Sequence, residues 1–184
     1  MAFKEPLAST SSHGVVKIGA GLSVNNGIIS VSSTGILDQA YFYDTSIQTN
    51  PVANAINLVS FNNTGISSGI SIIAGTQITV SKTANYNLQF SVQLDKTDAG
   101  TDDVDIWILK NGLTYPDTNT SLSLVGNNTV LLAGWSYILS LNSGDYVELA
   151  WQSTDINLRL FAKPAQVAPI RPVTPSARVT IVQL

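Results

Sequence analysis

The chain has 184 residues, of which 44% are apolar and only 11% are charged, and its formal net charge is −3. A charged fraction so far below the usual quarter, with no cluster of Lys and Arg, excludes the basic surface that nucleic-acid binding needs. The chain contains no cysteine, so disulfides and thiolate metal sites are excluded as well.

Residues 1–13 are a polar leader in which Phe3 and Leu7 are the main large apolar side chains. Such a segment buries too little surface to offset the entropy of ordering, so we expect an extended arm that a partner protein holds. An arm folded back on its own domain is the alternative. The leader lacks the long apolar core of a signal peptide, and no run of about 18 apolar residues occurs, so we expect synthesis in the cytoplasm and no membrane span.

The string GVVKIGAGLSVNNGIISVS follows the arm, in the neck that we assign to residues 14–39. Apolar and polar residues alternate there in short pieces between glycines, which is typical of strands. Each piece is too short to build a core of its own. It therefore packs either against the rest of its own chain or against the same piece in neighbouring chains.

From residue 40 to residue 184 the pattern is all-β. In YNLQFSVQL the apolar residues Tyr86, Leu88, Phe90, Val92 and Leu94 alternate with polar ones, which predicts one face on a core and one polar face. About eight to ten short strands at such spacing favour a jelly-roll sandwich. The four prolines within 162–177 predict an extended surface connection, followed by a last strand, ARVTIVQL.

Two stretches are apolar on both faces. In VDIWILK, Ile106 and Ile108 oppose Trp107 and Leu109, and GDYVELAW behaves in the same way. A strand with two apolar faces needs cover on both, from a second sheet or from another subunit.

The run DKTDAGTDDVD holds five aspartates between two expected strands. Carboxylate oxygens are the ligands that calcium prefers, which makes Asp102, Asp103 and Asp105 the candidates for a metal site. The spacing does not fit the EF-hand pattern, so a solvated loop without a metal is the interpretation we favour.

Little in the sequence supports catalysis, and we expect neither an enzyme nor a cofactor. The single histidine, His13, lies at the edge of the arm, far from the preorganised pocket that a catalytic triad requires. Glu148 is the one acidic residue in the middle of an expected strand, and a glycosidase needs two carboxylates across a cleft. The three tryptophans could stack on a carbohydrate, but packing in a core or subunit interface is the interpretation we favour.

The order of three motifs resembles the trimeric jelly roll of the C1q and tumour-necrosis-factor superfamily. The motifs are ITVSKTANYNLQFSVQL (78–94), WILKNG (107–112) and LSLNSGDYVELAW (139–151), and Asn85 stands where that family usually has glycine. The resemblance covers residues 40–184. It implies an all-β, C1q/TNF-like jelly-roll sandwich that assembles as a homotrimer.

Two further resemblances point to viruses. Residues 144–162 and 169–184 are similar to the tails of bacteriophage virion proteins, and residues 21–24 and 27–31 resemble the repeats of trimeric viral fibre shafts. The fibre-shaft resemblance implies the same homotrimer as the jelly-roll resemblance, with each neck piece packed around a threefold axis. The residues expected at the trimer interface are Leu22, Val24, Ile29, Val31, Tyr41 and Tyr43.

These resemblances imply a structural virion protein: a capsid decoration (cement) protein or short head fibre on the capsid surface. Its arm would bind the major capsid protein, with Phe3, Lys4 and Leu7 as the expected anchors because apolar groups carry most interface energy. The competing hypothesis is a receptor-binding tail fibre, or adhesin, whose jelly roll contacts host-surface glycans.

Overall fold

The computed structural model describes residues 22–25, 28–31 and 37–184, and none of these residues is helical, so they contain no helix that could span a membrane. The chain divides into two units, Met1–Ile36 and Leu37–Leu184. In the first, β1 (Leu22–Asn25) and β2 (Ile28–Val31) pair as an antiparallel hairpin.

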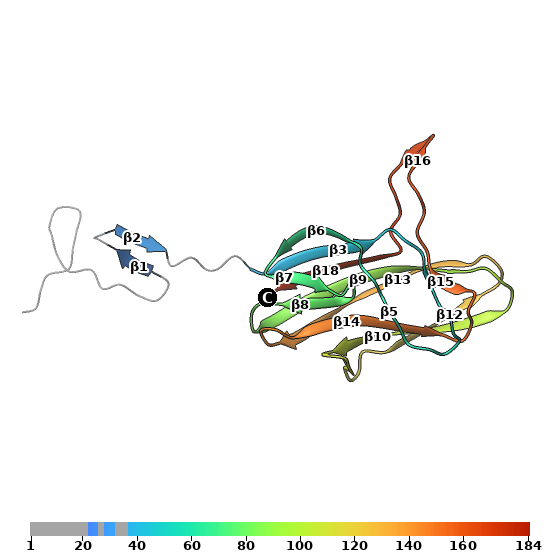
Figure 1. The fold of residues 1–184 in the computed structure, drawn as a ribbon, viewed down its shortest axis with the longest axis horizontal. Coiled ribbons are helices and arrows are strands. Elements are labelled where there is room, and N and C mark those ends of the chain that lie inside the picture. The colour runs from blue at the N-terminus through green and yellow to red at the C-terminus, as the bar shows by residue number, and fades with distance from the viewer. Residues whose placement is uncertain (1–21, 26–27, 32–36) are drawn as a thin grey trace, which may run out of the picture. The chain divides into compact units, whose positions relative to one another are not determined.

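The second unit contains two seven-stranded antiparallel sheets (Figure 1). We name them after their long strands, the β9 sheet and the β10 sheet. In spatial order the β9 sheet contains β4 (Gln48–Thr49), β15 (Leu158–Leu160), β9 (Ala84–Lys96), β18 (Ala177–Gln183), β3 (Gln39–Asp44) and β6 (Asn63–Ser68), with β13 (Val130–Leu141) paired to β9.

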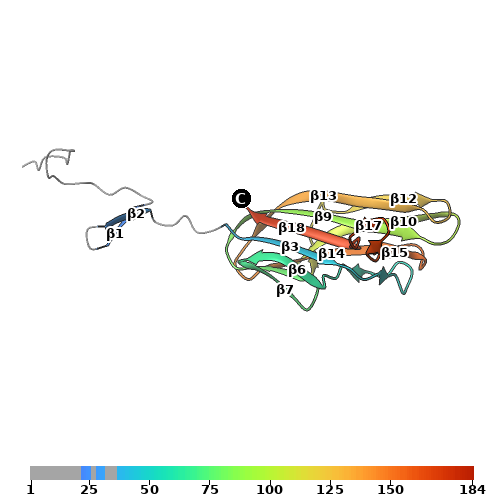
Figure 2. The ribbon, with the colours of Figure 1, turned by 90° about the horizontal axis from the view of Figure 1, so that it is seen from above.

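The β10 sheet lies against it (Figures 1 and 2). Its strands are β11 (Leu113–Thr114), β10 (Thr101–Lys110), β14 (Tyr146–Ser153), β8 (Gln77–Val80) and β7 (Ile70–Ile73), with β12 (Thr120–Val125) paired to β10 and β5 (Asn57–Leu58) paired to β14. The strands outnumber the eight to ten expected, partly because β4, β5 and β11 are two-residue pieces.

The core lies between the sheets and follows the alternation of the sequence. Tyr86, Leu88, Phe90, Val92 and Leu94 of β9 are all buried, as predicted. Their partners in the β10 sheet are the inward residues of β10 and β14, among them the fully buried Ile106, Ile108 and Trp151. The all-β sandwich that the sequence predicted is therefore confirmed.

The proline-rich segment is a hairpin and not a flat connection. It leaves the β9 sheet between β15 and β18, where Lys163 and Thr174 exchange backbone hydrogen bonds of 2.9 Å. β16 (Gln166–Val167) and β17 (Ile170–Arg171) then form its tip. Figure 1 shows this hairpin projecting from the sandwich on the side of the β9 sheet. The last strand, β18, occurs where the sequence predicted it.

Candidate functional site

The outward side of the β9 sheet carries one ion pair, Asp95 with Arg159 near β15, and the rest of it is a broad, nearly uncharged surface, which we call the Tyr41 face. Residues directly opposite one another in a sheet share a face, so the register defines the rows that cross it. One row runs from Ile66 through Tyr41, Thr180 and Gln89 to Ser136. The Tyr41 face consists of Gln39, Tyr41, Tyr43, Ile66, Asn87, Gln89, Ser91, Leu132, Ser136, Ile138, Arg178, Thr180 and Val182.

The chemistry of the Tyr41 face is aromatic, aliphatic and amide. Tyr41 and Tyr43 stack with their ring centroids 5.4 Å apart. Ile138 is 72% exposed and Ile66 is 63% exposed, and the residues beside each of them on this face are apolar or uncharged. The only charged side chain among these residues is Arg178. Exposed apolar groups with so little charge are typical of a surface that another protein covers.

The residues expected at the trimer interface fall in both units. Tyr41 and Tyr43 are half-buried on the Tyr41 face. In the neck hairpin, the backbone register pairs Leu22 with Val31 and Val24 with Ile29. Each neck strand thus has a partner within its own chain, and its contact with other chains stays a prediction. The expected anchors, Phe3, Lys4 and Leu7, and the single histidine, His13, lie outside the described residues.

The aspartate run does not form one solvated loop. Only residues 97–100 form the turn, and the aspartates after it belong to β10. Because side chains alternate along a strand, Asp102 points between the sheets and is 5% exposed, whereas Asp103 and Asp105 point outward. The pleat of the strand therefore separates Asp102 from Asp103 and Asp105, so the three calcium candidates do not converge on one site.

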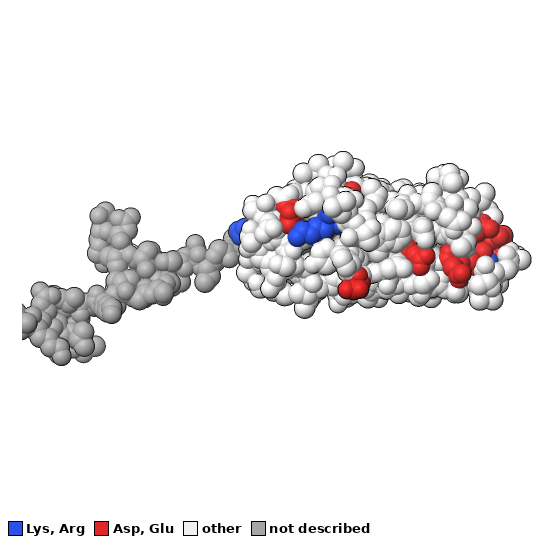
Figure 3. All heavy atoms as spheres, turned by 90° about the horizontal axis from the view of Figure 1, so that it is seen from below, with Lys and Arg blue, Asp and Glu red and all other residues white. Residues whose placement is uncertain are grey.

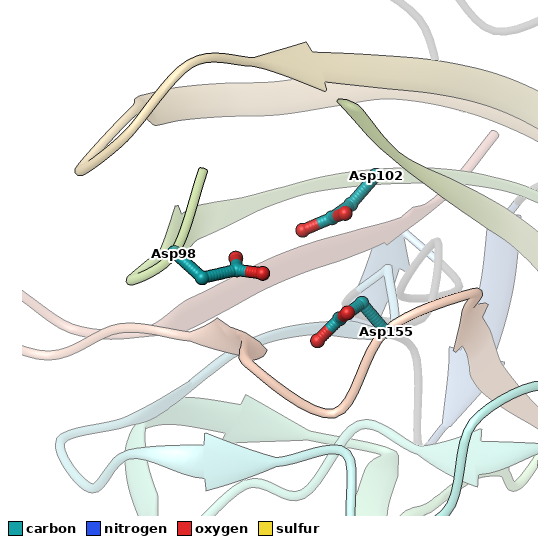
Figure 4. Close-up of side chains that lie close together, drawn as sticks. All are labelled: Asp98, Asp102 and Asp155. Atoms are coloured by element: carbon teal, nitrogen blue, oxygen red, sulfur yellow. The ribbon is translucent and has the colours of Figure 1, made fainter. Parts of the chain in front are cut away.

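A different set of aspartates comes together at this end of the sandwich (Figure 4). One carboxylate oxygen from each of Asp98, Asp102 and Asp155 lies within 4.8 Å of the others. The fully buried Lys96 Nζ lies 3.1 Å from Asp102 Oδ2 and 3.7 Å from Asp98 Oδ1. The lysine thus supplies a positive charge to the cluster from within the chain, which makes it a structural ion-pair network.

The outward side of the β10 sheet carries a hollow of about 310 Å³, which we call the Trp107 hollow. It is lined by Ile56, Asp105, Trp107, Thr114, Asn119 and Gln152. Asp105 and Trp107 are two residues apart on β10 and so share a face, and Gln152 lies directly opposite Asp105 on β14. Trp107 lines the hollow but is only 8% exposed, so most of its side chain is covered by its own chain.

The carboxylate of Asp105 is fixed by its neighbours. Gln152 Nε2 donates a hydrogen bond of 3.0 Å to Oδ2, and Asn119 Nδ2 donates one of 3.4 Å to Oδ1. Burial raises the pKa of the Asp105 carboxyl, but hydrogen bonds from Gln152, Ser121 and Asn119 lower it by more. The group therefore holds its charge at neutral pH and presents a fixed row of acceptors.

Sequence reasoning found Asp105 and Trp107 but assigned them to other roles, and it did not single out Ile56, Thr114, Asn119 or Gln152. The sequence signal for this site was the spacing of Asp105 and Trp107, which places a carboxylate and an aromatic ring on the same face of one strand. Glu148, the one carboxylate expected in a strand interior, is 4% exposed and accepts a 2.7 Å hydrogen bond from Thr76 Oγ1.

Solved structures share this architecture. The crystal structure of murine APRIL at pH 8.0 is 13% identical, covers 81% of this chain and 100% of that chain, and superposes with a TM-score of 0.50. The fold is a TNF-like jelly roll. The structure of Eiger TNF from S. frugiperda is 14% identical, with a TM-score of 0.46 and coverage of 80% of this chain and 92% of that one. No protein-family model and no curated protein matches the chain. At such identity the likeness concerns the fold alone, and it confirms the jelly roll that the motif order implied.

Proposed function

We propose that this chain is a non-enzymatic structural protein of a bacteriophage virion, which decorates the capsid as a homotrimer anchored by its first residues. The observation that carries the proposal is the Tyr41 face. A sheet face with stacked tyrosines, exposed isoleucines and one charge is unfavourable when exposed to water. Its burial against copies of the same chain would be favourable.

A closed threefold assembly is the arrangement that suits this face. The neck supports the same symmetry, because its Gly-punctuated pieces resemble viral fibre shafts. Short hairpins of this kind are marginal in isolation and become stable when copies pack together. The hollow on the opposite sheet would stay open to solvent in such a trimer.

The oligomeric state tests this part of the proposal directly. Light scattering coupled to size exclusion should give three times the mass of one chain at micromolar concentration. Thr180→Glu places a charge at the centre of the Tyr41 face and should yield folded monomers, since burying an unpaired charge is strongly unfavourable. Ser71→Glu, exposed on β7 of the other sheet, is the matched control and should stay trimeric. A monomeric wild-type chain would contradict the proposed homotrimer.

The capsid assignment is supported by the resemblance of residues 144–162 and 169–184 to phage virion proteins. An arm that binds only assembled shell stabilises that shell by its own binding free energy. Three arms on one trimer raise the effective concentration, so each contact can be weak. Immunogold microscopy with antibody to the jelly roll should label the phage head.

The arm has its own test. Replacing Phe3 and Leu7 with alanine should release trimers from purified capsids while the far-ultraviolet circular dichroism stays unchanged. The double variant bound at the wild-type level would show that these side chains are not the anchors.

A tail-tip adhesin is the second candidate function, and the Trp107 hollow favours it because that role requires a ligand site on the jelly roll. Gold label confined to the tail, together with binding of purified protein to host cells and not to empty capsids, would replace the decoration role with this one.

A further inference from the structure

The Trp107 hollow combines apolar side chains with a polar edge. The side chain of Ile56, 62% exposed, supplies most of its apolar surface, and Trp107, 8% exposed, adds a small part. Asp105, Asn119 and Gln152 supply one carboxylate and two carboxamides. A few fixed polar groups around an apolar surface are the usual make-up of a small-molecule site, and about 310 Å³ is at the lower end of the usual volumes.

The polar edge is organised before any ligand arrives. Asn119 and Gln152 each direct an amide nitrogen at Asp105. Within residues 37–184, their amide oxygens accept no hydrogen bond, and each oxygen of Asp105 has lone pairs left. The edge therefore offers several acceptors in fixed positions, together with the second hydrogen of each amide as a donor. A ligand meeting it with hydroxyl groups can satisfy both kinds.

The charge of the hollow restricts the class of ligand. Among residues 37–184 no Lys or Arg lines it, and Lys and Arg are few on the side of the molecule that Figure 3 shows. Asp105 keeps its negative charge, so phosphates, sulfates and acidic sugars are repelled. An ammonium group can only donate, so it could bond to Asp105 but could not accept from the free amide hydrogens of Asn119 and Gln152, whereas a hydroxyl can do both. A neutral ligand with hydroxyls on one edge and C–H groups on one face fits both halves of the hollow.

From this arrangement we infer that the Trp107 hollow is a binding site for a neutral saccharide, with room for one pyranose ring. The ring contacts Ile56 and the small exposed part of Trp107, and its hydroxyls bond to Asp105, Asn119 and Gln152. The site is on the β10 sheet and the proposed subunit contact is on the β9 sheet, so the inference does not depend on the virion role. A trimer would present three such sites and bind a multivalent glycan with added avidity.

Amide-resolved NMR of the full chain tests the site with glucose, galactose, mannose and N-acetylglucosamine at millimolar concentrations. At least one sugar should shift the Trp107 indole resonance and the amide signals of Asn119 and Gln152. Asn119→Ala, at an exposed position, should weaken that binding about tenfold, as expected for the loss of hydrogen bonds to a ligand. Asn127→Ala, exposed and outside the hollow, is the matched control and should bind as wild type does.

Three outcomes would overturn the inference. No shift with any of the four sugars and no binding to an array of neutral glycans would remove the site. Shifts confined to the Tyr41 face would move it elsewhere. Stronger binding of choline than of every sugar would make the hollow a cation site. None of these outcomes bears on the oligomeric state or the head location, so the two proposals fail separately.

Discussion

Lys96 Nζ lies 3.1 Å from Asp102 Oδ2, and this pair joins the two sheets of the sandwich across its interior. Lys96 is the last residue of β9 in one sheet and Asp102 is the second residue of β10 in the other, and the lysine side chain has no solvent exposure. A turn of four residues, 97–100, connects the two strands, so the ion pair closes the end of the core where the apolar side chains are replaced by aspartates.

Removing one charge of this pair should be costly. Asp102→Asn keeps the shape but leaves the buried ammonium with Asp98, at 3.7 Å, as its one remaining ion-pair partner among residues 37–184. We expect the free energy of unfolding to fall by about 3 kcal/mol, because a buried charge without its partner is strongly unfavourable. Urea denaturation measures the change. Asp103→Asn, exposed on the same strand, should leave stability nearly unaltered, and equal stability of the two variants would contradict the structural role of the pair.

The stability of the chain should weaken below about pH 4 through Asp145. The side chain of Asn111, the backbone N–H of Asn142 and the Lys110 ammonium lower the pKa of this carboxyl to about 2. A carboxyl whose pKa is lower in the folded than in the unfolded state stabilises the fold at every pH above the unfolded-state pKa. That gain disappears as the pH falls from about 4 to about 2.

Asp145→Asn isolates this contribution. At neutral pH the variant should be less stable than wild type by about 1 kcal/mol, since solvent screens a carboxylate so near the surface. Near pH 2, the difference between the free energies of unfolding of the two proteins should shrink by about that amount, as denaturation curves would show. A difference that stays constant from neutral pH to about pH 2 would show that ionisation of Asp145 does not contribute.

Gly69 is required by its contact with Asp38. Its φ is +70°, and a Cβ added there would lie 2.2 Å from Asp38 Cγ. Asp38 is buried and ion-paired with Lys82 at 2.6 Å, so it has no room to withdraw. Gly69→Ala should therefore cost about 3 kcal/mol or more through overpacking and strain.

The control for this substitution is Gly75→Ala. Gly75 also has a positive φ, +80°, but open space surrounds the added methyl group. We expect a loss of about 1 kcal/mol from backbone strain alone. Thermal unfolding compares the two variants, and equal losses would rule out the clash with Asp38 as the cause of the difference.

Thr118 supports the turn between β10 and β12 through its hydroxyl. Its Oγ1 accepts a 3.1 Å hydrogen bond from the Ile108 backbone N–H and donates one of 2.8 Å to the Tyr115 carbonyl oxygen. Thr118→Val keeps the shape but removes both bonds, which should cost about 2 kcal/mol at this buried position. Thr118→Ser should retain most of the stability by urea denaturation. A valine variant as stable as the serine variant would contradict this account.

The parts of the fold set by local alternation could be predicted from the sequence. Period-two patterning located the core face of β9 and the strand β18, because side-chain direction in a strand depends only on neighbours in sequence. The same period explains the misjudged aspartate run. Adjacent letters suggested one acidic loop, but a strand sends Asp102 inward and Asp105 outward.

The Trp107 hollow could not be predicted as a whole. Gln152 reaches Asp105 only because β14 pairs with β10 in one particular register, and Asn119 and Ile56 arrive from segments far apart in the chain. Register is decided by the packing of the complete sheets and not by any single stretch. The Asp98, Asp102 and Asp155 cluster depends on long-range geometry in the same way.

The position of β18 has a consequence for how the protein is made. This strand lies between β9 and β3, although β3 and β9 are synthesised long before it. Until residues 177–183 leave the ribosome, both earlier strands present open edges that can pair with another chain. Closure of the sheet must therefore follow the completion of β18, and such non-local pairing is slow. A nascent chain of this protein is most vulnerable to aggregation in that interval, and the Tyr41 face, which β18 helps to build, is not available to a second copy until it ends.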